Sequence, residues 1–391
     1  MLLHTLHLQN ILSFDDTSEP IPLRPLNVII GPNGSGKSNF LEAVELLRCA
    51  PNQLVKSIRE NGGVVDWLWK GSADTPPAAL DAVFSYPNWK KSLLRYRLSF
   101  TAVQQRFQIV EECVEREYLL AASRRKSAPK YYYRFQGGHP VLDVRGVTRS
   151  LLDENIDLEH SILAQRRDPS QYPELTYLAE QMERIRLYRE WTFGRRAAVR
   201  RPQKTDLPNS MLEPDGENLG LVLNRLRRTP SVKQRLLKEL RALYAGIDDY
   251  DVAVEGGTVQ VFFQEGRKNI PATRLSDGTL RYLCLLVILC DPQPPPLICI
   301  EEPELGLHPD VLPTLAELLK EASERCQLIV TTHSDVLVDA MTDQPESVMV
   351  CEKGEGGTTL NRLDAKRLRP WLEKYRLGQL WTRGEIGGNR W

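Results

Sequence analysis

The clearest candidate for chemistry in this sequence is a glycine-rich loop that fits the pattern GxxxxGK[ST]. Glycines at this spacing allow backbone N–H groups to turn inward around phosphates, and the helix that follows points its positive end at them. The lysine of such a loop reaches the β- and γ-phosphates, and the next hydroxyl is a ligand for Mg²⁺. A chance glycine turn is the alternative, but an apolar strand precedes this loop and an amphipathic helix follows it. The pattern predicts a nucleotide-phosphate site at Gly31, Pro32, Asn33, Gly34, Ser35, Gly36, Lys37 and Ser38.

Two adjacent acids, Glu301 and Glu302, follow an apolar strand expected over residues 297–300. In a nucleotide site, the first acid of such a pair holds Mg²⁺ through water, and the second polarises the attacking water. A strand that ends in acids before a proline turn is also common without any such role. The pair therefore becomes a candidate site only in combination with the phosphate loop.

Two further short segments could complete such a site. Ser276 and Gly278 open a helix expected over 279–290. A serine there is most often an ordinary N-cap, but with a glycine nearby it also offers free N–H donors to an anion. His333 follows an apolar strand and has hydroxyl neighbours. A lone histidine after a strand is more often structural, although at this place in the order it could contact a γ-phosphate.

The elements that must position these residues have an α/β pattern at both ends of the chain. Leu26–Ile30 predicts a strand that leads into the phosphate loop, and the apolar spacing over 38–48 predicts a helix. After residue 270, helices alternate with strands, which predicts a parallel sheet covered on both faces. Residues 78–145 are rich in β-branched and aromatic types and predict a small antiparallel sheet. The core is therefore expected to be split along the chain by a large insert.

Taken in this order, the four segments resemble the ABC-type ATPase heads of the RecF, SMC and OLD families. There they are Walker A, the signature loop, Walker B with its catalytic glutamate, and the switch histidine. An Asn-x-x-Ser-Phe pattern that ends at Phe14 matches as well. The phrase EEPELGLHP, which begins at Glu301, resembles OLD-like bacterial AAA-family ATPases. Residues 377–391 resemble the end of a group of predicted bacterial ATPases, whereas the middle of the chain matches only loosely.

The resemblance implies a P-loop NTPase of the ABC-ATPase type. This is an α/β fold with a split, mostly parallel core sheet, an antiparallel β lobe and an inserted helical arm or lobe. It implies ATP and Mg²⁺ as cofactors, hydrolysis of ATP to ADP and phosphate, and a homodimer or higher oligomer whose heads sandwich ATP. The roles it carries over are catalysis for Lys37, Glu302 and His333, nucleotide binding for residues 31–38 with Ser276 and Gly278, and metal binding for Ser38 and Glu301.

This sequence departs from the broad ABC pattern at three places. The Mg²⁺-side acid is Glu301 rather than Asp, the signature reads LSDGT with Asp277 and Thr279, and His308 stands where an Asp is usual. The first two substitutions occur in OLD-like relatives, and the third leaves open how the two sites communicate. A glutamine that senses Mg²⁺ is also expected between the halves. Gln165 is a candidate, and an ordinary solvated glutamine is the alternative.

The chain is expected to divide into four parts. Residues 1–147 would form the N-terminal half of the head, with the phosphate loop and the β lobe. Residues 148–250 would form a helical, Arg-rich insert, 251–345 the C-terminal half of the head, and 346–391 a C-terminal extension. SMC proteins fill the insert with a long coiled coil, but no sustained heptad occurs here, which favours a short arm over a rod.

Basic residues cluster in the insert. Residues Arg184–Lys204 include eight Lys or Arg and a single acid, with Tyr188, Trp191 and Phe193 interleaved. Arginines that contact phosphates and aromatic rings that stack on bases would suit DNA or RNA. A salt-bridged, solvated face or a contact to an acidic partner is the alternative. Arg124–Lys126 is a smaller basic cluster, expected in a loop.

Composition excludes several classes. The 391 residues carry 51 Lys and Arg against 51 Asp and Glu, which excludes a globally basic nucleic-acid coat. The longest apolar run, Leu283–Cys290, has eight residues, whereas a membrane span needs roughly 20. Seven cysteines without a CxxC pair and no signal-peptide pattern favour a reduced, cytoplasmic protein without membrane contact.

The resemblance implies two classes of function. The first is a sensor or regulator with a separate effector, a nuclease or a toxin, in bacterial anti-phage defence. The second is a RecF-like repair ATPase that acts directly on DNA; a transporter ATPase is a weaker third because the glutamine-type signature is absent. OLD proteins fuse the head to a Toprim nuclease, but the 58 residues after His333 are expected to be too few for that fold.

Overall fold

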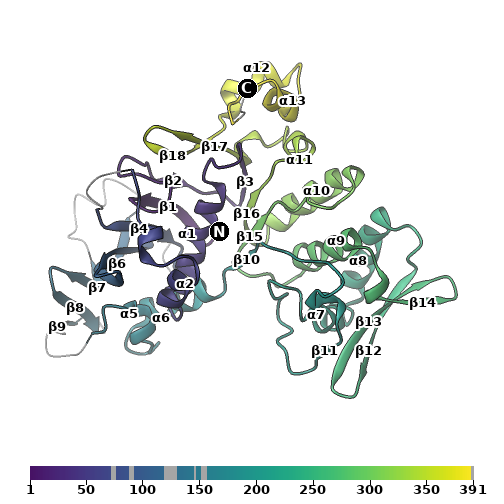
Figure 1. The fold of residues 1–391 in the computed structure, drawn as a ribbon, viewed down its shortest axis with the longest axis horizontal. Coiled ribbons are helices and arrows are strands. Elements are labelled where there is room, and N and C mark those ends of the chain that lie inside the picture. The colour runs from purple at the N-terminus through teal and green to yellow at the C-terminus, as the bar shows by residue number, and fades with distance from the viewer. Residues whose placement is uncertain (72–75, 88–91, 119–129, 145–146, 151–155, 389–391) are drawn as a thin grey trace.

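The computed structural model describes the chain except residues 72–75, 88–91, 119–129, 145–146, 151–155 and 389–391. The basic cluster Arg124–Lys126 and the last three residues of the C-terminal pattern lie outside the described residues. Figure 1 shows a central sheet with a β-rich lobe on one side and a smaller lobe of helices and hairpins on the other. The C-terminal helices lie at the far end of the sheet from the smaller lobe.

The central sheet contains six strands in the order β10-β15-β16-β3-β17-β18. The first five are parallel to one another, and β18 returns antiparallel to β17. This is the split, mostly parallel sheet that the sequence predicts. The bounds are β3 Leu26–Ile30, β10 Arg186–Tyr188, β15 Leu297–Glu301, β16 Gln327–Thr331, β17 Val348–Gly354 and β18 Gly357–Arg362.

Successive residues of the parallel strands face two different cores. In β3, Val28 and Ile30 pack with one buried cluster and Ile29 with the other. Because both faces are covered, β3 and β16 are buried along their whole length rather than at alternate residues. Helices α9 (Asp277–Leu289) and α10 (Leu312–Ser323) contribute to the first core, and helix α1 (Lys37–Cys49) to the second.

The second core continues into the β lobe. Its antiparallel sheet has the order β2-β1-β4-β5-β6-β7-β8-β9, and short helices close it against α1. The strands are β1 Leu3–Gln9, β2 Ile21–Pro22, β4 Ala78–Phe84, β5 Ser92–Val103, β6 Arg106–Tyr118, β7 Tyr131–Gln136, β8 His139–Val144 and β9 Val147–Ser150. The helices are α2 Leu54–Glu60, α3 Val64–Trp67, α5 Ile162–Gln165 and α6 Pro173–Glu183.

The smaller lobe packs helices against a second antiparallel sheet, in which β13 lies between β11 and β12 and also pairs with β14. The longest described helix is α8, with 14 residues, so the described insert contains no rod. The sequence predicts 148–250 as a helical insert, but this range also supplies β10, the edge strand of the central sheet. The elements are α7 Leu219–Leu226, α8 Pro230–Leu243, β11 Gln203–Lys204, β12 Asp249–Glu255, β13 Thr258–Glu265, β14 Lys268–Pro271, and the 3-10 turns η1 Ala198–Arg200 and η2 Ala272–Arg274.

The C-terminal extension packs on the helix after His333. A Cβ on Gly378 would lie 2.4 Å from the carbonyl oxygen of Asp335, so α13 and α11 approach backbone to backbone. The seven cysteines are buried and form no disulfide. No described helix is long and apolar enough to cross a membrane. The remaining elements are α11 Asp335–Asp339, α12 Ala365–Leu372, α13 Leu377–Thr382, η3 Pro309–Val311 and η4 Pro345–Ser347.

Candidate functional site

The phosphate loop leaves the end of β3 and enters α1. Gly31, Gly34 and Gly36 have φ angles of 152°, 78° and 110°, in the left-handed region that favours glycine. A Cβ on Gly36 would lie 2.2 Å from the Thr358 Oγ1 atom, and one on Gly31 would lie 2.2 Å from the Cys351 carbonyl oxygen. The loop is therefore pressed against the β17–β18 hairpin, and no larger residue fits at these two positions.

Lys37 lies within this loop. Its ammonium donates hydrogen bonds to the carbonyl oxygens of Gly31, at 2.8 Å, and Pro32, at 3.0 Å. Burial lowers the pKa of this ammonium, while nearby acids, Glu302 and Glu301 among them, act in the opposite direction. The loop thus curls around a partly desolvated donor group, which suits an incoming anion.

Ser38 and Glu301 meet across the site. The Ser38 hydroxyl donates to Glu301 Oε1 at 2.6 Å, although 263 residues separate the two in sequence. The other carboxylate oxygen of Glu301 accepts a hydrogen bond from Arg189 Nε at 2.9 Å. A hydroxyl and a carboxylate are the hard oxygen donors that Mg²⁺ prefers, so these residues fit that ion. Among the described residues, no group of three or more His, Cys, Asp or Glu side chains could hold a metal. A metal here would therefore depend on Ser38, Glu301, phosphate and water.

Glu302 stands at a strained turn directly after β15. Its φ angle is 45°, a left-handed conformation that costs on the order of 1 kcal/mol for a residue with a side chain. Several hydrogen bonds hold it there: among them, its N–H donates to the Thr331 carbonyl at 3.0 Å, and its own carbonyl accepts from Arg281 at 2.9 Å. This turn points Glu302 toward His333, whose Nε2 lies 3.4 Å from Glu302 Oε1.

His333 lies beside Glu302 and near Lys37, with 34% of its side-chain area exposed. Burial lowers the pKa of its imidazole, the charge of Lys37 lowers it further, and Glu302 opposes both. The balance favours a neutral ring at pH 7. Such a ring can accept or donate a hydrogen bond beside the carboxylate.

Glu304 belongs to the same cluster and was missed from the sequence as a site residue. Its Oε1 accepts from the Thr332 hydroxyl at 2.7 Å and from the His333 backbone N–H at 2.8 Å. Its other oxygen, Oε2, is buried without a hydrogen-bond partner in the described structure. Burial raises the pKa of this carboxyl. The signal in the sequence was the third acid of the EEPE phrase, two residues after Glu302.

The signature segment begins α9. Ser276 caps the helix, because its Oγ accepts from the Thr279 N–H at 3.1 Å. Arg200 pairs with Asp277 and also donates to the Leu275 carbonyl at 2.7 Å. No hydrogen bond in the described structure joins Ser276 or Gly278 to the phosphate loop. Ser276 and Gly278 therefore belong to the same site as the phosphate loop only if a bound ligand or a second copy of the chain connects them.

Gln165, the Mg²⁺-sensing candidate from the sequence, makes local hydrogen bonds in the described structure. Its amide nitrogen donates to the carbonyls of Asp157 and His160 at 2.9 and 2.7 Å, and its oxygen accepts from the Asp157 N–H at 3.1 Å. All three bonds close the loop that leads into α5. The residue that reaches Glu301 is Arg189, which the sequence placed in the basic stretch.

The aromatic residues of the basic stretch are inside the protein. Tyr188 is buried and donates its hydroxyl to the Leu212 carbonyl at 2.7 Å. Trp191 and Phe193 are half-buried, and the Arg281 guanidinium lies 5.4 Å from the ring centre of Trp191. Tyr188 is therefore not exposed for stacking on nucleic-acid bases, whereas Trp191 and Phe193 each keep part of their surface exposed. The five exposed basic residues of the stretch are Arg184, Arg195, Arg196, Arg201 and Lys204.

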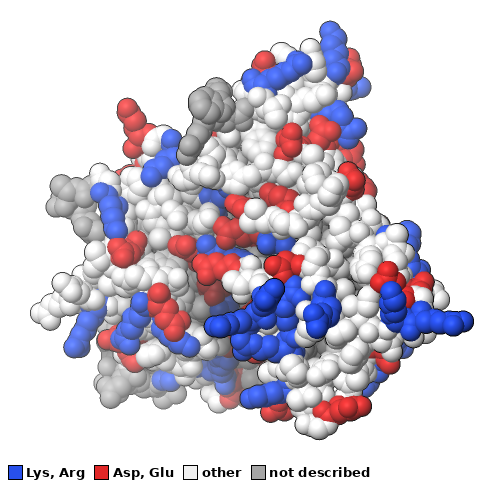
Figure 2. Space-filling view, turned by 45° about the vertical axis from the view of Figure 1, so that its right-hand side comes forward, with Lys and Arg blue, Asp and Glu red and all other residues white. Residues whose placement is uncertain are grey.

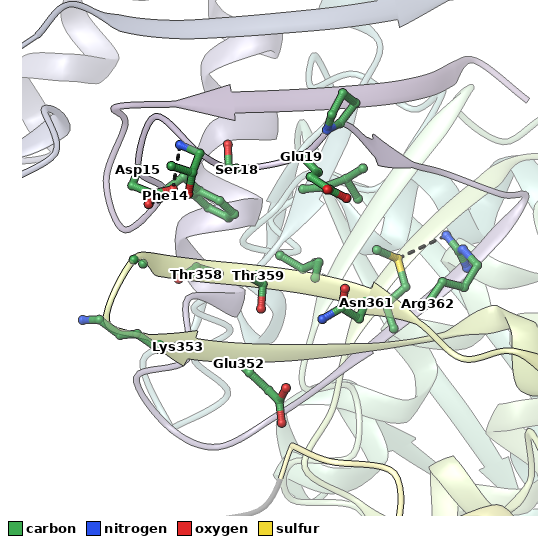
Figure 3. A pocket seen from close by; sticks show the side chains of 18 of the residues that line it. Phe14, Asp15, Ser18, Glu19, Glu352, Lys353, Thr358, Thr359, Asn361 and Arg362 are labelled. Carbon is green, nitrogen blue, oxygen red and sulfur yellow. Dashed lines mark hydrogen bonds between the residues drawn. The ribbon is translucent and has the colours of Figure 1, made fainter.

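A cavity of about 860 Å³ adjoins the phosphate loop at Pro32. Figure 3 shows its two walls: the segment with Asp15, Ser18 and Glu19 faces the β17–β18 hairpin with Glu352, Lys353 and Thr359. The walls carry both acids and bases with hydroxyl groups between them, so the cavity suits a polar molecule rather than a lipid.

The order of the strands brings all these groups to one edge of the sheet. The phosphate loop follows β3, His333 follows β16 and the acid pair ends β15, and these three strands are neighbours in parallel. A parallel sheet of this order, with a phosphate loop and an acid pair separated by one strand at the carboxyl ends of the strands, is typical of a P-loop nucleotide-binding head.

Comparisons with known proteins agree with this class. The chain belongs to the family described as "AAA domain, putative AbiEii toxin, Type IV TA system", whose model matches residues 26–339. An Smc head bound to the C-winged helix domain of ScpA is similar in fold, with a TM-score of 0.58 at 15% identity, over 94% of this chain and 99% of that one. The Pyrococcus furiosus Smc head with an extended coiled coil, bound to the C-terminal domain of ScpA, gives 0.51 at 14% identity, over 96% and 99%. No curated protein matches the sequence. The fold class predicted from the sequence is therefore confirmed, as is the resemblance to ABC-type heads.

Proposed function

We propose that this chain hydrolyses ATP to ADP and phosphate as one head of an ATP-closed dimer, and that it regulates a separate effector protein. The observation that carries the enzymatic part is the convergence of Ser38 with Glu301 and of Glu302 with His333, at 2.6 and 3.4 Å. Three segments that are separated in sequence thus bring together a phosphate-binding loop, a metal-binding acid with its neighbouring general base, and a polar partner.

Each residue has a distinct part in this proposal. Lys37 exchanges its bonds to Gly31 and Pro32 for the β- and γ-phosphate oxygens. Mg²⁺, held by Ser38 and by Glu301 through water, would neutralise charge on the phosphates. Glu302 orients the attacking water and accepts its proton, and His333 holds the Glu302 carboxylate in place.

The nucleoside end of ATP would occupy the cavity next to Pro32. This cavity includes Pro32 of the phosphate loop in its lining, and Figure 3 shows polar side chains such as Glu19, Glu352 and Thr359 on its walls. Asp15 and Asn361 on opposite walls offer an acceptor and an amide for ribose hydroxyls or base edges.

A second copy of the chain would complete the site. Ser276 and Gly278 have no hydrogen bond to the phosphate loop in the described structure, so they are available to the ATP of another head. Leu305, in the loop directly after the acid pair, is 50% exposed. An exposed leucine beside a nucleotide site supports closure of this face against a partner.

The test of the ATPase dimer is Glu302→Gln in the presence of ATP and Mg²⁺. Without the base, hydrolysis should fall by at least 100-fold, and mass photometry should show the dimer accumulating. Lys37→Ala, which cannot hold the phosphates, is the control that should remain monomeric. If the Glu302→Gln variant still hydrolyses ATP and its mass never rises, the assignment is wrong.

The regulatory part rests on the family and on the Smc comparison. The family description refers to a toxin system, and the similar Smc heads are bound by a separate protein, ScpA. Both support a head that works with another protein, and we propose from the toxin-system description alone that this work belongs to bacterial defence against phage. Affinity purification of the tagged chain should recover the product of a neighbouring gene. A complex that forms with the wild type but not with Lys37→Ala would show that the nucleotide state controls it, whereas no partner from either would oppose this role.

A second candidate is a RecF-like ATPase that acts directly on DNA. The observation that favours it is the set of exposed arginine and lysine side chains in the insert. Figure 2 shows Lys and Arg side chains gathered next to a group of Asp and Glu side chains on one face. Replacing both Arg195 and Arg196 by Ala should weaken DNA binding and flatten its salt dependence, because each phosphate contact contributes to that slope. Binding that does not change between low and moderate salt would exclude phosphate contacts.

A further inference from the structure

Arg189 stands next to the acid that we assign to the metal. Strand β10 runs parallel to β15, with Tyr188 paired to Ile300, so the next residue of each strand is Arg189 and Glu301. Strand β10 is at the edge of the sheet, and its chain turns away from the sheet after Tyr188. The pairing of β10 with β15 therefore places the permanently charged Arg189 guanidinium next to the Glu301 carboxylate.

The contacts are specific. Arg189 Nε lies 2.9 Å from Glu301 Oε2, and a second guanidinium nitrogen lies 3.4 Å from an oxygen of Glu42 on α1. The other oxygen of Glu301 is bonded to Ser38. Arg189 and Glu301 are both mostly buried, with 24% and 19% of their side-chain areas exposed. Screening by water is reduced at such a pair, so the charge of Arg189 is felt strongly at the carboxylate.

We propose that Arg189 is an internal cation that opposes Mg²⁺ at Glu301 and so sets the Mg²⁺ concentration at which the head holds ATP. This inference rests on the proposed nucleotide site. A carboxylate already neutralised by a guanidinium attracts a divalent ion less than a free one does. Glu42 gives Arg189 a second acid to pair with, so the guanidinium can release Glu301 without losing all of its charge compensation.

The position of Arg189 also connects the metal acid to the signature. Residues 189–200, here named the strap, begin at the Glu301 contact and end at η1, where Arg200 pairs with Asp277. Between these points Trp191 packs against Arg281, whose guanidinium holds the Glu302 carbonyl. A change in the partner of Arg189 thus occurs at one end of a segment that contacts Glu301 and the signature directly, and Glu302 only through Arg281.

The experiment measures nucleotide binding without turnover. In the full chain carrying Glu302→Gln, the fluorescence of a labelled ATP analogue is followed during an Mg²⁺ titration, for the parent and for added Arg189→Ala or Arg189→Lys. We expect Arg189→Ala to lower the Mg²⁺ concentration at half-maximal binding by about tenfold, which is about 1.4 kcal/mol. Arg189→Lys keeps the charge and should stay near the parent. All variants share the same equilibrium between Mg²⁺ and the free nucleotide, so a difference between them belongs to the protein.

Arg227→Ala is the matched control, because Arg227 pairs with Asp251 in the smaller lobe and should leave the midpoint unchanged. An unchanged or raised midpoint in Arg189→Ala, with a melting temperature near that of the parent, would overturn the proposal. A raised midpoint would mean that Arg189 helps to hold the nucleotide. If the parent itself binds no labelled ATP at any Mg²⁺ concentration, the proposed nucleotide site fails and this inference fails with it. Binding by the parent with no shift refutes only the role of Arg189.

Discussion

A Cβ atom on Gly278 would lie 2.6 Å from the carbonyl oxygen of Gly306. The start of the signature helix and the loop after the acid pair therefore pack backbone to backbone within one head. The position needs glycine for lack of space, since its backbone does not lie in the left-handed region. The two loops proposed to face the partner head are thus held at a fixed distance from each other.

Gly278→Ala should push these loops apart. We expect the rate of ATP hydrolysis to fall by at least tenfold, because the signature and the acid pair no longer lie at the correct distance from each other. The melting temperature should change by only a few degrees. The control is Gly194→Ala, where a Cβ would meet no atom within 4 Å. Steady-state ATPase rates and thermal unfolding check both variants, and full activity in Gly278→Ala would show that this contact does not matter.

Lys37→Met should remove ATP binding while keeping the loop. The methionine side chain can fill much of the same space, but it cannot donate to phosphates or to the Gly31 and Pro32 carbonyls. We expect the Kd for ATP to rise by roughly 100-fold, or nearly 3 kcal/mol, as expected for the loss of charged hydrogen bonds. Isothermal titration measures this directly, and an affinity within threefold of the wild type would refute a phosphate role for Lys37.

The fold class and the candidate phosphate loop could be predicted because their signals are local. A largely apolar strand, a glycine loop and an amphipathic helix occupy consecutive residues around Gly31–Ser38, and their geometry follows from sequence spacing. The parallel sheet follows from the later alternation of helices and strands. These features can be predicted without knowing which distant segments of the chain contact one another.

The missed residues act through contacts made by the tertiary structure. Arg189 lies in a stretch of arginines that are identical in type, and only the pairing of β10 with β15 singles it out. Thr358, which packs under Gly36, belongs to a hairpin 322 residues away in the chain. Gln165 was considered because it lies between a sheet and helices, but such a position does not specify an approach to Glu301. Sequence spacing cannot supply these pairings.

The buried carboxyl of Glu112 should make the stability of the β lobe depend on pH. It is fully buried, and burial raises its pKa to about 7, although Ser161, the Ile162 N–H and Tyr96 hydrogen-bond to it. Because the folded pKa exceeds the unfolded value of 4.5, stability is highest below pH 4.5 and is lost as pH rises toward 7. The loss is on the order of 3 kcal/mol.

Glu112→Gln removes this titration while its amide can still donate to the two hydroxyls and accept from Ile162. Thermal unfolding of both proteins at pH 5 and pH 8 provides the measurement. From pH 5 to pH 8, the melting temperature of the wild type should fall more than that of the variant. Equal losses would show that Glu112 is ionised in the folded protein at pH 5 as well.

Glu304 should act by positioning His333 rather than by touching the substrate. Its carboxylate fixes the His333 backbone N–H and the Thr332 hydroxyl, so Glu304→Ala releases the turn that carries the imidazole. We expect kcat to fall by at least tenfold with KM for ATP changed by less than threefold, because the phosphate loop is intact. Glu304→Gln retains an oxygen acceptor for both donors and should recover most of the rate. A rate in Glu304→Gln as low as in Glu304→Ala would instead assign a direct chemical role to the carboxyl group, and a large rise in KM would place Glu304 in nucleotide binding.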